Sequence, residues 1–104
     1  MLSPTERSRL KAHVADDNQR LVTIFDTLGD SNRCQLFRLI AKRPGINVTE
    51  AAGVLGLSLP LASQHFKILD QNDLLVKSKK GREVHYQLND RDPMVQAIVK
   101  VIEN

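Results

Sequence analysis

Four cationic side chains in the stretch KSKKGR, residues 77–82, could bind the phosphate groups of a nucleic acid. They are Lys77, Lys79, Lys80 and Arg82. Ammonium and guanidinium groups neutralise backbone phosphates and release counterions, so a dense cluster of them favours binding. Gly81 within the run can adopt the positive φ of a tight hairpin turn. An isolated run of this kind is more often a solvated hairpin tip, so its interpretation depends on the elements around it.

A second stretch, GLSLPLASQHFKILDQNDLL, combines an apolar face with polar side chains. Ala62, Phe66 and Leu69 recur at i, i+4 and i+7 and predict the inward face of a helix. The side chains that this spacing leaves off the inward face are Leu61, Ser63, Gln64 and Lys67. The helix therefore has both a core-facing side and a side that is free to contact a ligand.

Three of the outward side chains have the chemistry to contact a nucleic acid. The amide of Gln64 can donate and accept on a base edge, Ser63 can reach a base or a phosphate, and Lys67 suits a phosphate. His65 in the same helix is ambiguous. Partial packing against the neighbouring helix is the preferred interpretation for His65, and phosphate contact is the second.

A shorter helix is predicted directly before this one. NVTE, residues 47–50, fits a capping box in which Asn47 caps the helix and Glu50 reaches back. The helix then runs to Leu55. Gly56 is expected to end it in the left-handed conformation, because a residue without a Cβ enters that region without penalty.

The connection between the two helices is very short. Ser58 is a good N-cap for the second helix, and Pro60 falls in its first turn, where a missing N–H does no harm. Two helices joined in this way cross steeply. The pattern predicts a helix-turn-helix over residues 47–72.

A β-hairpin is predicted over residues 75–88, with strands at Leu75–Ser78 and Glu83–Leu88. Alternation in the second strand places Val84, Tyr86 and Leu88 on one face and Glu83, His85 and Gln87 on the other. His85 on the outer face is most simply solvated. A helix-turn-helix followed by a basic hairpin is a winged helix, in which the second helix fits the major groove and the wing cations neutralise neighbouring phosphates.

Helices are also predicted on both sides of this unit. Thr5–Val14 is amphipathic, and Asn18–Leu28 has one buried face made of Leu21, Ile24, Phe25 and Leu28. Asp30 caps a third helix, whose core positions are Cys34, Phe37, Ile40 and Ala41. Pro93 opens a last helix with a wider apolar face than a small domain needs, so its surplus is expected to pack against a second copy of the chain.

The composition fits one small folded domain. The 104 residues are 41% hydrophobic and 26% charged, with a formal net charge of +3, and we expect a single winged-helix domain over residues 1–104. The fold class is mainly α with a small β-hairpin (α+β), with five to six helices and a two-stranded wing. No signal peptide or membrane span is recognisable, so the expected location is the cytoplasm. Cys34 is the only cysteine, which rules out an intrachain disulfide.

The sequence resembles the ArsR family of bacterial winged-helix repressors from about Leu21 to Leu88. LGDSNRCQLFRLI is similar to the family's Leu-Ala-Asp-Pro-Thr-Arg helix start, and LGLSLPLASQHFKILDQNDLLVKSKKGREVHYQL is similar to its Leu-Gly-x-Ser…Ser-x-His-Leu…Gly-Leu-Val…Gly…Tyr-x-Leu pattern. The resemblance implies a homodimer, joined through helices in residues 1–28 and 91–104. It also implies binding to an inverted-repeat operator on double-stranded DNA and release by an effector.

The resemblance also assigns residues to these roles. Family DNA contacts fall on Leu59, Pro60, Ser63 and Gln64 and, in the wing, on Lys79, Lys80 and Arg82. The full set of DNA-binding candidates is Ser58, Leu59, Pro60, Leu61, Ser63, Gln64, His65, Lys67, Lys79, Lys80 and Arg82. The dimer-interface candidates are Leu10, Val14, Met94, Val95, Ile98, Val101 and Ile102. Leu59 and Pro60 depart from the polar residues common at their positions, which favours apolar contact with thymine methyl groups.

No metal or other cofactor is expected. Many relatives bind thiophilic metals through Cys-x-Cys-Asp, but those positions here read Asn47-Val48-Thr49-Glu50, which lack soft thiolate ligands. Relatives that bind zinc at their last helix use His there, and this last helix has none. A weak candidate consists of His13, Asp16 and Asp17 with Glu103 from the partner. A solvated helix face is the more frequent explanation for such residues.

Two other classes of function compete with DNA binding. An enzyme is not expected, because His13, His65 and His85 fall on separate elements and no nucleophile or phosphate-loop motif is present. The stronger alternative is a winged helix that contacts another protein, or a regulator controlled by a protein partner, for which Leu59 and Leu61 would be suitable. The operator, the regulated genes, the effector and the choice between activator and repressor stay open.

Overall fold

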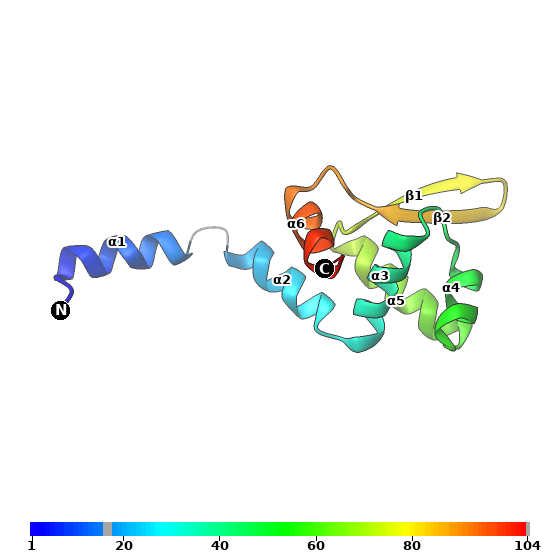
Figure 1. The fold of residues 1–104 in the computed structure, drawn as a ribbon, viewed down its shortest axis with the longest axis horizontal. Coiled ribbons are helices and arrows are strands. Elements are labelled where there is room, and N and C mark those ends of the chain that lie inside the picture. The colour runs from blue at the N-terminus through cyan, green and yellow to red at the C-terminus, as the bar shows by residue number, and fades with distance from the viewer. Residues whose placement is uncertain (16–17, 104) are drawn as a thin grey trace.

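The computed structural model of the protein describes residues 1–15 and 18–103. Along this part of the chain the elements are α1 (Pro4–Ala15), α2 (Asn18–Leu28), α3 (Ser31–Lys42), α4 (Val48–Leu55), α5 (Leu59–Gln71), β1 (Leu75–Lys80), β2 (Glu83–Leu88) and α6 (Pro93–Ile102) (Figure 1). The predicted fold class, mainly α with a small β-hairpin, is confirmed. None of the helices described is both long enough and apolar enough to cross a bilayer.

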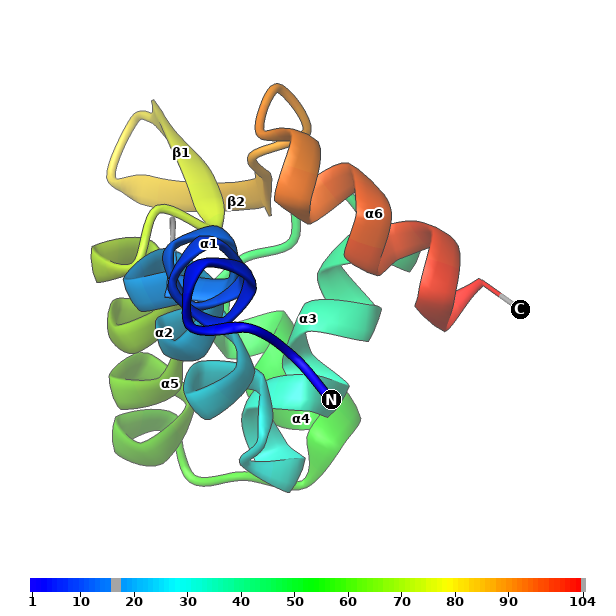
Figure 2. The ribbon, with the colours of Figure 1, turned by 90° about the vertical axis from the view of Figure 1, so that its left-hand side faces the viewer.

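Helix α3 lies at the centre of the fold. It contacts α2, α4, α5, α6 and β2, and Figure 2 shows it between α5 and α6. Its buried side chains are Leu36, Phe37 and Ile40, which meet Phe66 and Leu69 of α5 and Val95 of α6. Burial of one side chain of this size contributes about 1.5–3 kcal/mol to the stability of the fold. This core holds α5 against the body of the chain.

The start of α3 follows the predicted capping pattern. The backbone N–H of Arg33 donates to Asp30 Oδ1 at 3.0 Å, so Asp30 is the N-cap. This hydrogen bond holds the pKa of the Asp30 carboxyl below its ordinary value. Cys34, predicted to face the core, is only half-buried.

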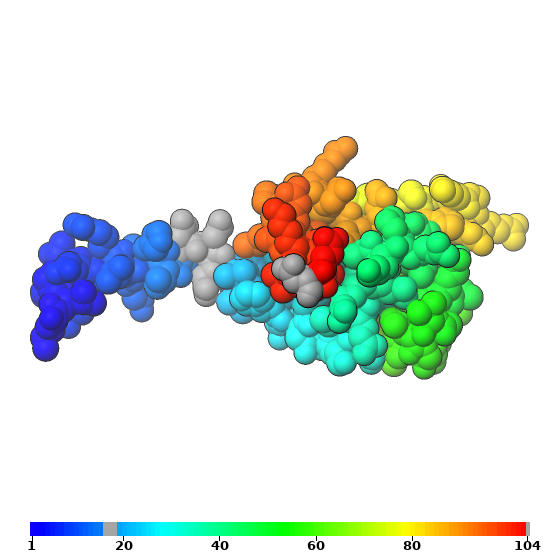
Figure 3. All heavy atoms as spheres, in the orientation of Figure 1, coloured from blue at the N-terminus to red at the C-terminus, as the bar shows by residue number. Residues whose placement is uncertain are grey.

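Helix α1 projects from the rest of the structure and buries no side chain (Figures 1 and 3). A capping box begins it: the N–H of Glu6 donates to Ser3 Oγ at 3.1 Å, and the N–H of Ser3 donates to Glu6 Oε1 at 3.2 Å. Leu10 and Val14 on this helix are exposed. A helix of about 12 residues is marginal in isolation, so α1 needs a packing surface that these described contacts do not supply.

The predicted buried face of α2 is only half correct. Ile24 is fully buried and Leu28 is half-buried, but Leu21 and Phe25 are 39% and 64% exposed. The reason is that α2 and α6 do not close over one another, which leaves a hollow of about 230 Å³ that residues of both helices line. We call this the α2–α6 hollow; its lining is Leu21, Ile24, Phe25, Met94, Ala97, Ile98 and Val101.

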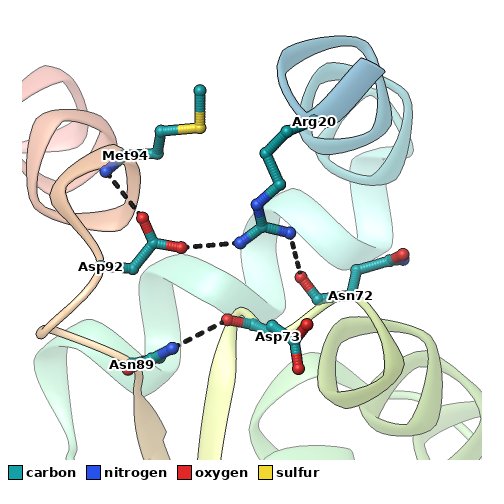
Figure 4. Close-up of polar contacts among 6 residues, drawn as sticks. All are labelled: Arg20, Asn72, Asp73, Asn89, Asp92 and Met94. Carbon is teal, nitrogen blue, oxygen red and sulfur yellow. Dashed lines mark hydrogen bonds and ion pairs between the residues drawn. The ribbon is translucent and has the colours of Figure 1, made fainter. Parts of the chain in front are cut away.

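A polar clamp around Arg20 joins three segments (Figure 4). Arg20 Nη1 donates to the backbone oxygen of Asn72 at 2.6 Å, and Nη2 donates to Asp92 Oδ2 at 2.6 Å. Asp92 also caps α6, because its Oδ1 accepts from the N–H of Met94 at 2.9 Å. The hydrogen bond from Arg20 holds the pKa of the Asp92 carboxyl below its ordinary value. The clamp thus fixes α2, the end of α5 and the start of α6 relative to one another.

Candidate nucleic-acid interface

The turn between α4 and α5 has the capping residues and the glycine that the sequence predicts. The N–H of Glu50 donates to Asn47 Oδ1 at 2.8 Å and the N–H of Asn47 donates to Glu50 Oε1 at 3.1 Å, so the capping box is complete. Gly56 has φ of 66° and ends α4 in the left-handed conformation. Ser58 Oγ accepts from the N–H of Leu61 at 3.3 Å and caps α5. The helix-turn-helix is therefore defined by satisfied backbone groups on both sides of the turn.

Helix α5 has the predicted inward and outward faces. Ala62, Phe66 and Leu69 are at most 1% exposed. The exposed side chains on α5 and its cap are Ser58, Leu59, Pro60, Leu61, Ser63, Gln64, Lys67 and Gln71. Val54 at the end of α4 is exposed as well, and together with Leu59 and Leu61 it adds apolar surface near the start of α5. The outward face is thus polar along the helix and apolar at its beginning.

His65 packs inside the fold, as its preferred interpretation predicts, and its inclusion among the DNA-binding candidates does not fit this burial. The residue is only 6% exposed, and neither ring nitrogen has a hydrogen-bond partner among the residues described. The physical reason is the width of the buried stripe on α5, which includes the i+3 position as well as i, i+4 and i+7. His65 therefore belongs to the packing of the helix.

The wing is longer than predicted and ends in a two-residue turn. Strand β1 reaches Lys80, which pairs with Glu83 in an antiparallel register, so only Gly81 and Arg82 form the connection. Gly81 has φ of 64°, as the predicted turn requires. Lys79, Lys80 and Arg82 are exposed at this tip.

Two contacts place the wing beside α5. The rings of Phe66 and Tyr86 have centroids 4.6 Å apart, and Lys77 Nζ lies 3.3 Å from Asp70 Oδ2. Lys77 is thus paired with α5, unlike the cations at the tip. Figures 1 and 3 show the hairpin tip and the α4–α5 turn at the same end of the molecule, opposite α1. The fold therefore presents the polar face of α5 and the wing cations at one end of the molecule.

The prediction that His85 is solvated is wrong. Its Nδ1 lies 2.7 Å from the backbone oxygen of Gly45 and its Nε2 lies 3.1 Å from Glu83 Oε2, and the side chain is 17% exposed. The connection between α3 and α4 pairs with β2 through Ile46 and Tyr86 and so passes close to this ring. Strand alternation contains no signal for that contact.

The dimer-interface candidates divide into three groups. Leu10, Val14 and Val101 are exposed, and Met94, Ile98 and Ile102 are half-buried. Val95 is 0% exposed, so its prediction as an interface residue is wrong. The cause is again the helical stripe, because Val95 points into the core of its own chain while its neighbours on α6 face the α2–α6 hollow.

The residues at the family's metal position do not fit a thiophilic metal. Asn47 and Glu50 use their side chains in the capping box, and neither is a soft ligand. Of the weaker candidates, His13 and Glu103 are exposed, while Asp16 and Asp17 lie outside the residues that the structure describes. Within residues 1–15 and 18–103, no group of three His, Cys, Asp or Glu side chains could hold a metal ion.

A helix pair joined by a tight turn and followed by a cation-tipped hairpin defines a winged helix-turn-helix protein. No family model matches the chain. It is 33% identical over 78 residues to the arsenic resistance transcriptional regulator ArsR1 of Pseudomonas putida, a match that covers 74% of this chain and 61% of that protein. It is 29% identical over 72 residues to the arsenical resistance operon repressor of Escherichia coli, a match that covers 69% of this chain and 62% of that protein. The chain thus spans less than two thirds of the length of these curated relatives.

Solved structures show the same fold. The homodimeric winged helix-turn-helix DNA-binding domain Mb0332 of Mycobacterium bovis, described as a possible ArsR-family regulator, superimposes with a TM-score of 0.68 at 23% identity. That match covers 99% of this chain and 90% of that one. The curated relatives confirm the resemblance to the ArsR family that the sequence predicts, and the solved structure confirms the fold. The chain is an ArsR-like winged helix-turn-helix protein.

Proposed function

We propose that this chain binds double-stranded DNA sequence-specifically as a dimeric transcriptional repressor of the ArsR type. One observation carries the proposal: the exposed Ser63 and Gln64 lie on a helix that an aromatic contact and an ion pair join to a wing with exposed cations at its tip. A helix of this kind fits the major groove, and the wing then meets the phosphates beside it. The relatives in Pseudomonas putida and Escherichia coli are named as a transcriptional regulator and a repressor, which supports the same function.

The apolar start of α5 indicates what kind of base contact to expect. Leu59 is 51% exposed and Leu61 is 37% exposed, and neither can hydrogen-bond to a base. Apolar side chains in the major groove contact the methyl group of thymine. We infer half-sites in which thymine lies near Leu59 and the hydrogen-bonded base lies near Gln64.

A second copy of the chain is the partner that we propose for the α2–α6 hollow. Phe25 and Val101 expose large apolar surfaces beside it, and α1 carries the exposed Leu10 and Val14 without a surface to pack on. The neighbour Mb0332 is described as homodimeric, which supports this arrangement. A two-fold dimer would place two α5 helices against an inverted-repeat operator.

Release by an effector is part of the proposal, but not through the family's cysteine site, because Asn47 and Glu50 occupy it as a capping box. A regulator of this kind acts where the DNA lies, so we infer a cytoplasmic location.

The test is binding to a fluorescently labelled duplex of random sequence, about 30 base pairs long, at salt concentrations from about 50 to 200 mM. We expect tight binding at low salt and a steep loss at high salt, with a slope of about −0.9 for each phosphate neutralised. A module that serves only protein contact would show no binding at low salt, and that result would contradict the proposal.

A further inference from the structure

Three contacts with the rest of the fold meet at one residue pair of the wing. Tyr86 on β2 lies opposite Lys77 on β1. The N–H of Gly45 donates to the backbone oxygen of Tyr86 at 2.8 Å, and the N–H of Tyr86 donates to that of Ile46 at 3.0 Å. Because Tyr86 directs both backbone groups to the connection between α3 and α4, its pair with Lys77 has no ladder hydrogen bond. The side chains of such a pair lie close together on one face of the hairpin.

Both side chains of this pair contact α5. The ring of Tyr86 is half-buried, and its centroid lies 4.6 Å from that of Phe66, which is 1% exposed and belongs to the core around α3. Lys77 Nζ lies 3.3 Å from Asp70 Oδ2, but the Lys77 side chain is 59% exposed. An exposed ion pair adds little, whereas an aromatic pair against a core stabilises through burial and ring contact. The Tyr86 ring is therefore the stronger of the two anchors.

The outer part of the hairpin stands away from α4. A hollow of about 240 Å³ lies between them, and its lining is Asn47, Val48, Thr49, Arg82, Glu83 and Val84. Among residues 1–15 and 18–103, no carboxylate pairs with Lys79, Lys80 or Arg82. A two-stranded hairpin is marginally stable by itself and twists more than a larger sheet. The direction of the tip thus depends on how the base of the hairpin is held.

A small rotation at the base is enough to displace the tip. Arg82 precedes Tyr86 by four residues in sequence, which corresponds to about 13 Å of extended strand. A rotation of about 20° at Tyr86, within the range of twist between paired strands, moves the tip by about 4–5 Å. A hydrogen bond to a phosphate requires a donor within about 3 Å of the oxygen. Such a rotation therefore separates the tip cations from the phosphates that they would otherwise meet.

Resting on the DNA-binding function proposed above, we propose that Tyr86 is a positioning residue of the wing. The contact of its ring with Phe66 sets the angle between the hairpin and α5. At this angle the cations of the tip reach the phosphates beside the base pairs that α5 contacts. Tyr86 acts through the wing and does not contact the DNA itself.

The first experiment measures binding to a labelled duplex of random sequence at salt concentrations from about 50 to 200 mM. Tyr86→Thr keeps a residue suited to a strand but removes the ring. It should weaken binding about tenfold and reduce the salt slope by about 0.9 for each tip cation that no longer meets a phosphate. Tyr86→Phe keeps the ring and should bind like the wild type. Val76→Ala is the matched control, since Val76 is 43% exposed on the same hairpin, and it should change neither quantity.

A double-mutant cycle separates positioning from folding. Arg82→Ala should weaken the wild-type chain about fivefold but Tyr86→Thr less than about twofold, because the displaced tip no longer contacts phosphate. The preference of Tyr86→Thr for a duplex selected by the wild-type chain over an unselected one should stay unchanged, since α5 is intact. A general loss of structure would remove this preference as well.

A measurement without DNA reports the position of the wing directly. In nitrogen-15 NMR relaxation of the free protein, the backbone N–H of Arg82 should be more mobile in Tyr86→Thr than in the wild type. If Tyr86→Thr does not fold, Tyr86→Leu replaces it, because leucine keeps apolar contact with Phe66 but loses the aromatic pair. Tyr86→Leu should show the same changes at a smaller size.

The outcomes distinguish the two proposals. A wild-type chain that binds no duplex at low salt overturns the DNA-binding function and the role of Tyr86 with it. If the wild type binds, a wild-type salt slope in Tyr86→Thr, or an equal cost of Arg82→Ala in both backgrounds, overturns the role of Tyr86 alone. Equal losses in Tyr86→Phe and Tyr86→Thr also overturn it, because they would assign a DNA contact to the hydroxyl group.

Discussion

The helix-turn-helix with its wing differs from the α2–α6 hollow in how many of its side chains find partners within the same chain. Around the α4–α5 turn the capping groups have partners, the wing is fixed to α5 by Lys77 and Tyr86, and what remains exposed is largely polar or cationic. At the α2–α6 hollow the exposed side chains are apolar, and Phe25 is 64% exposed. An exposed apolar surface of this kind marks an interaction site.

This difference separates two tasks within a small domain. A single chain holds its proposed DNA-contacting residues in place through its own contacts, whereas the other end is suited to a second copy. We therefore expect substitutions at the α2–α6 hollow to weaken dimerisation and, as a consequence, to weaken DNA binding. Substitutions on the wing and α5 should change DNA binding with assembly intact.

Phe25→Asp should give the largest effect. A carboxylate in the α2–α6 hollow opposes burial of that surface, so the dimer should dissociate into monomers in sedimentation velocity. Duplex affinity should fall by about a hundredfold, because two linked half-site contacts become independent. Val54→Asp is the matched control, since Val54 is 65% exposed on α4, and it should leave the oligomeric state unchanged. A Phe25→Asp variant that stays dimeric would contradict the assignment of the hollow.

Arg82→Ala should weaken binding to every duplex by a similar factor of about five and reduce the salt slope by about 0.9 for each protomer. The reason is that a tip cation meets phosphate and not a base edge. Lys42→Ala removes a cation from the end of α3, outside the wing and α5, and serves as the control. Titrations at several salt concentrations check this, and an unchanged slope for Arg82→Ala would exclude a wing contact with phosphate.

Asp92→Asn should lower the free energy of unfolding at pH 7 by about 1 kcal/mol, because the N-cap is kept but the charged bond from Arg20 is lost. The pKa of Asp92 is lowered in the folded chain, so its stabilising effect is complete above the unfolded pKa, near 4. It disappears as pH falls through the folded pKa. Urea unfolding between about pH 2 and 7 should therefore show a smaller acid loss in Asp92→Asn than in the wild type. If both proteins lost the same free energy of unfolding as the pH falls, the stabilising role of the Arg20–Asp92 pair would be contradicted.

His65→Leu should have the smallest effect. It replaces two buried nitrogens that lack partners with an apolar side chain, so the free energy of unfolding should stay the same or rise by up to about 1 kcal/mol. DNA binding should not change, because the ring is buried. Chemical unfolding and duplex titration of the same sample test both points. A clear loss of affinity in a stable variant would restore His65 as a DNA contact.

The features that could be predicted from the sequence are those fixed by near neighbours. The capping box of Asn47 and Glu50, the left-handed Gly56 and the Ser58 cap depend on residues within a few positions, and each is found as predicted. The hairpin turn at Gly81 belongs to the same group. These local signals were sufficient to place the helix-turn-helix and the wing.

The features that could not be predicted depend on contacts between distant segments. Whether His65 and Val95 face outward is decided by how wide a stripe α3 covers, and Phe25 is exposed because α6 does not close over it. His85 meets Gly45 across 40 positions of sequence, which no periodicity reports. Spacing along one helix or strand identifies a face but not what covers that face.

The central claim is that the outward face of α5 reads bases, and Gln64→Ala tests it most directly. The measurement is affinity for a duplex selected from a random pool by the wild-type chain, compared with affinity for an unselected duplex. The proposed function predicts that Gln64→Ala loses about tenfold on the selected duplex, since one base-edge contact provides about 1–3 kcal/mol of discrimination, and keeps its affinity for the unselected one. Identical losses on both duplexes would contradict the claim.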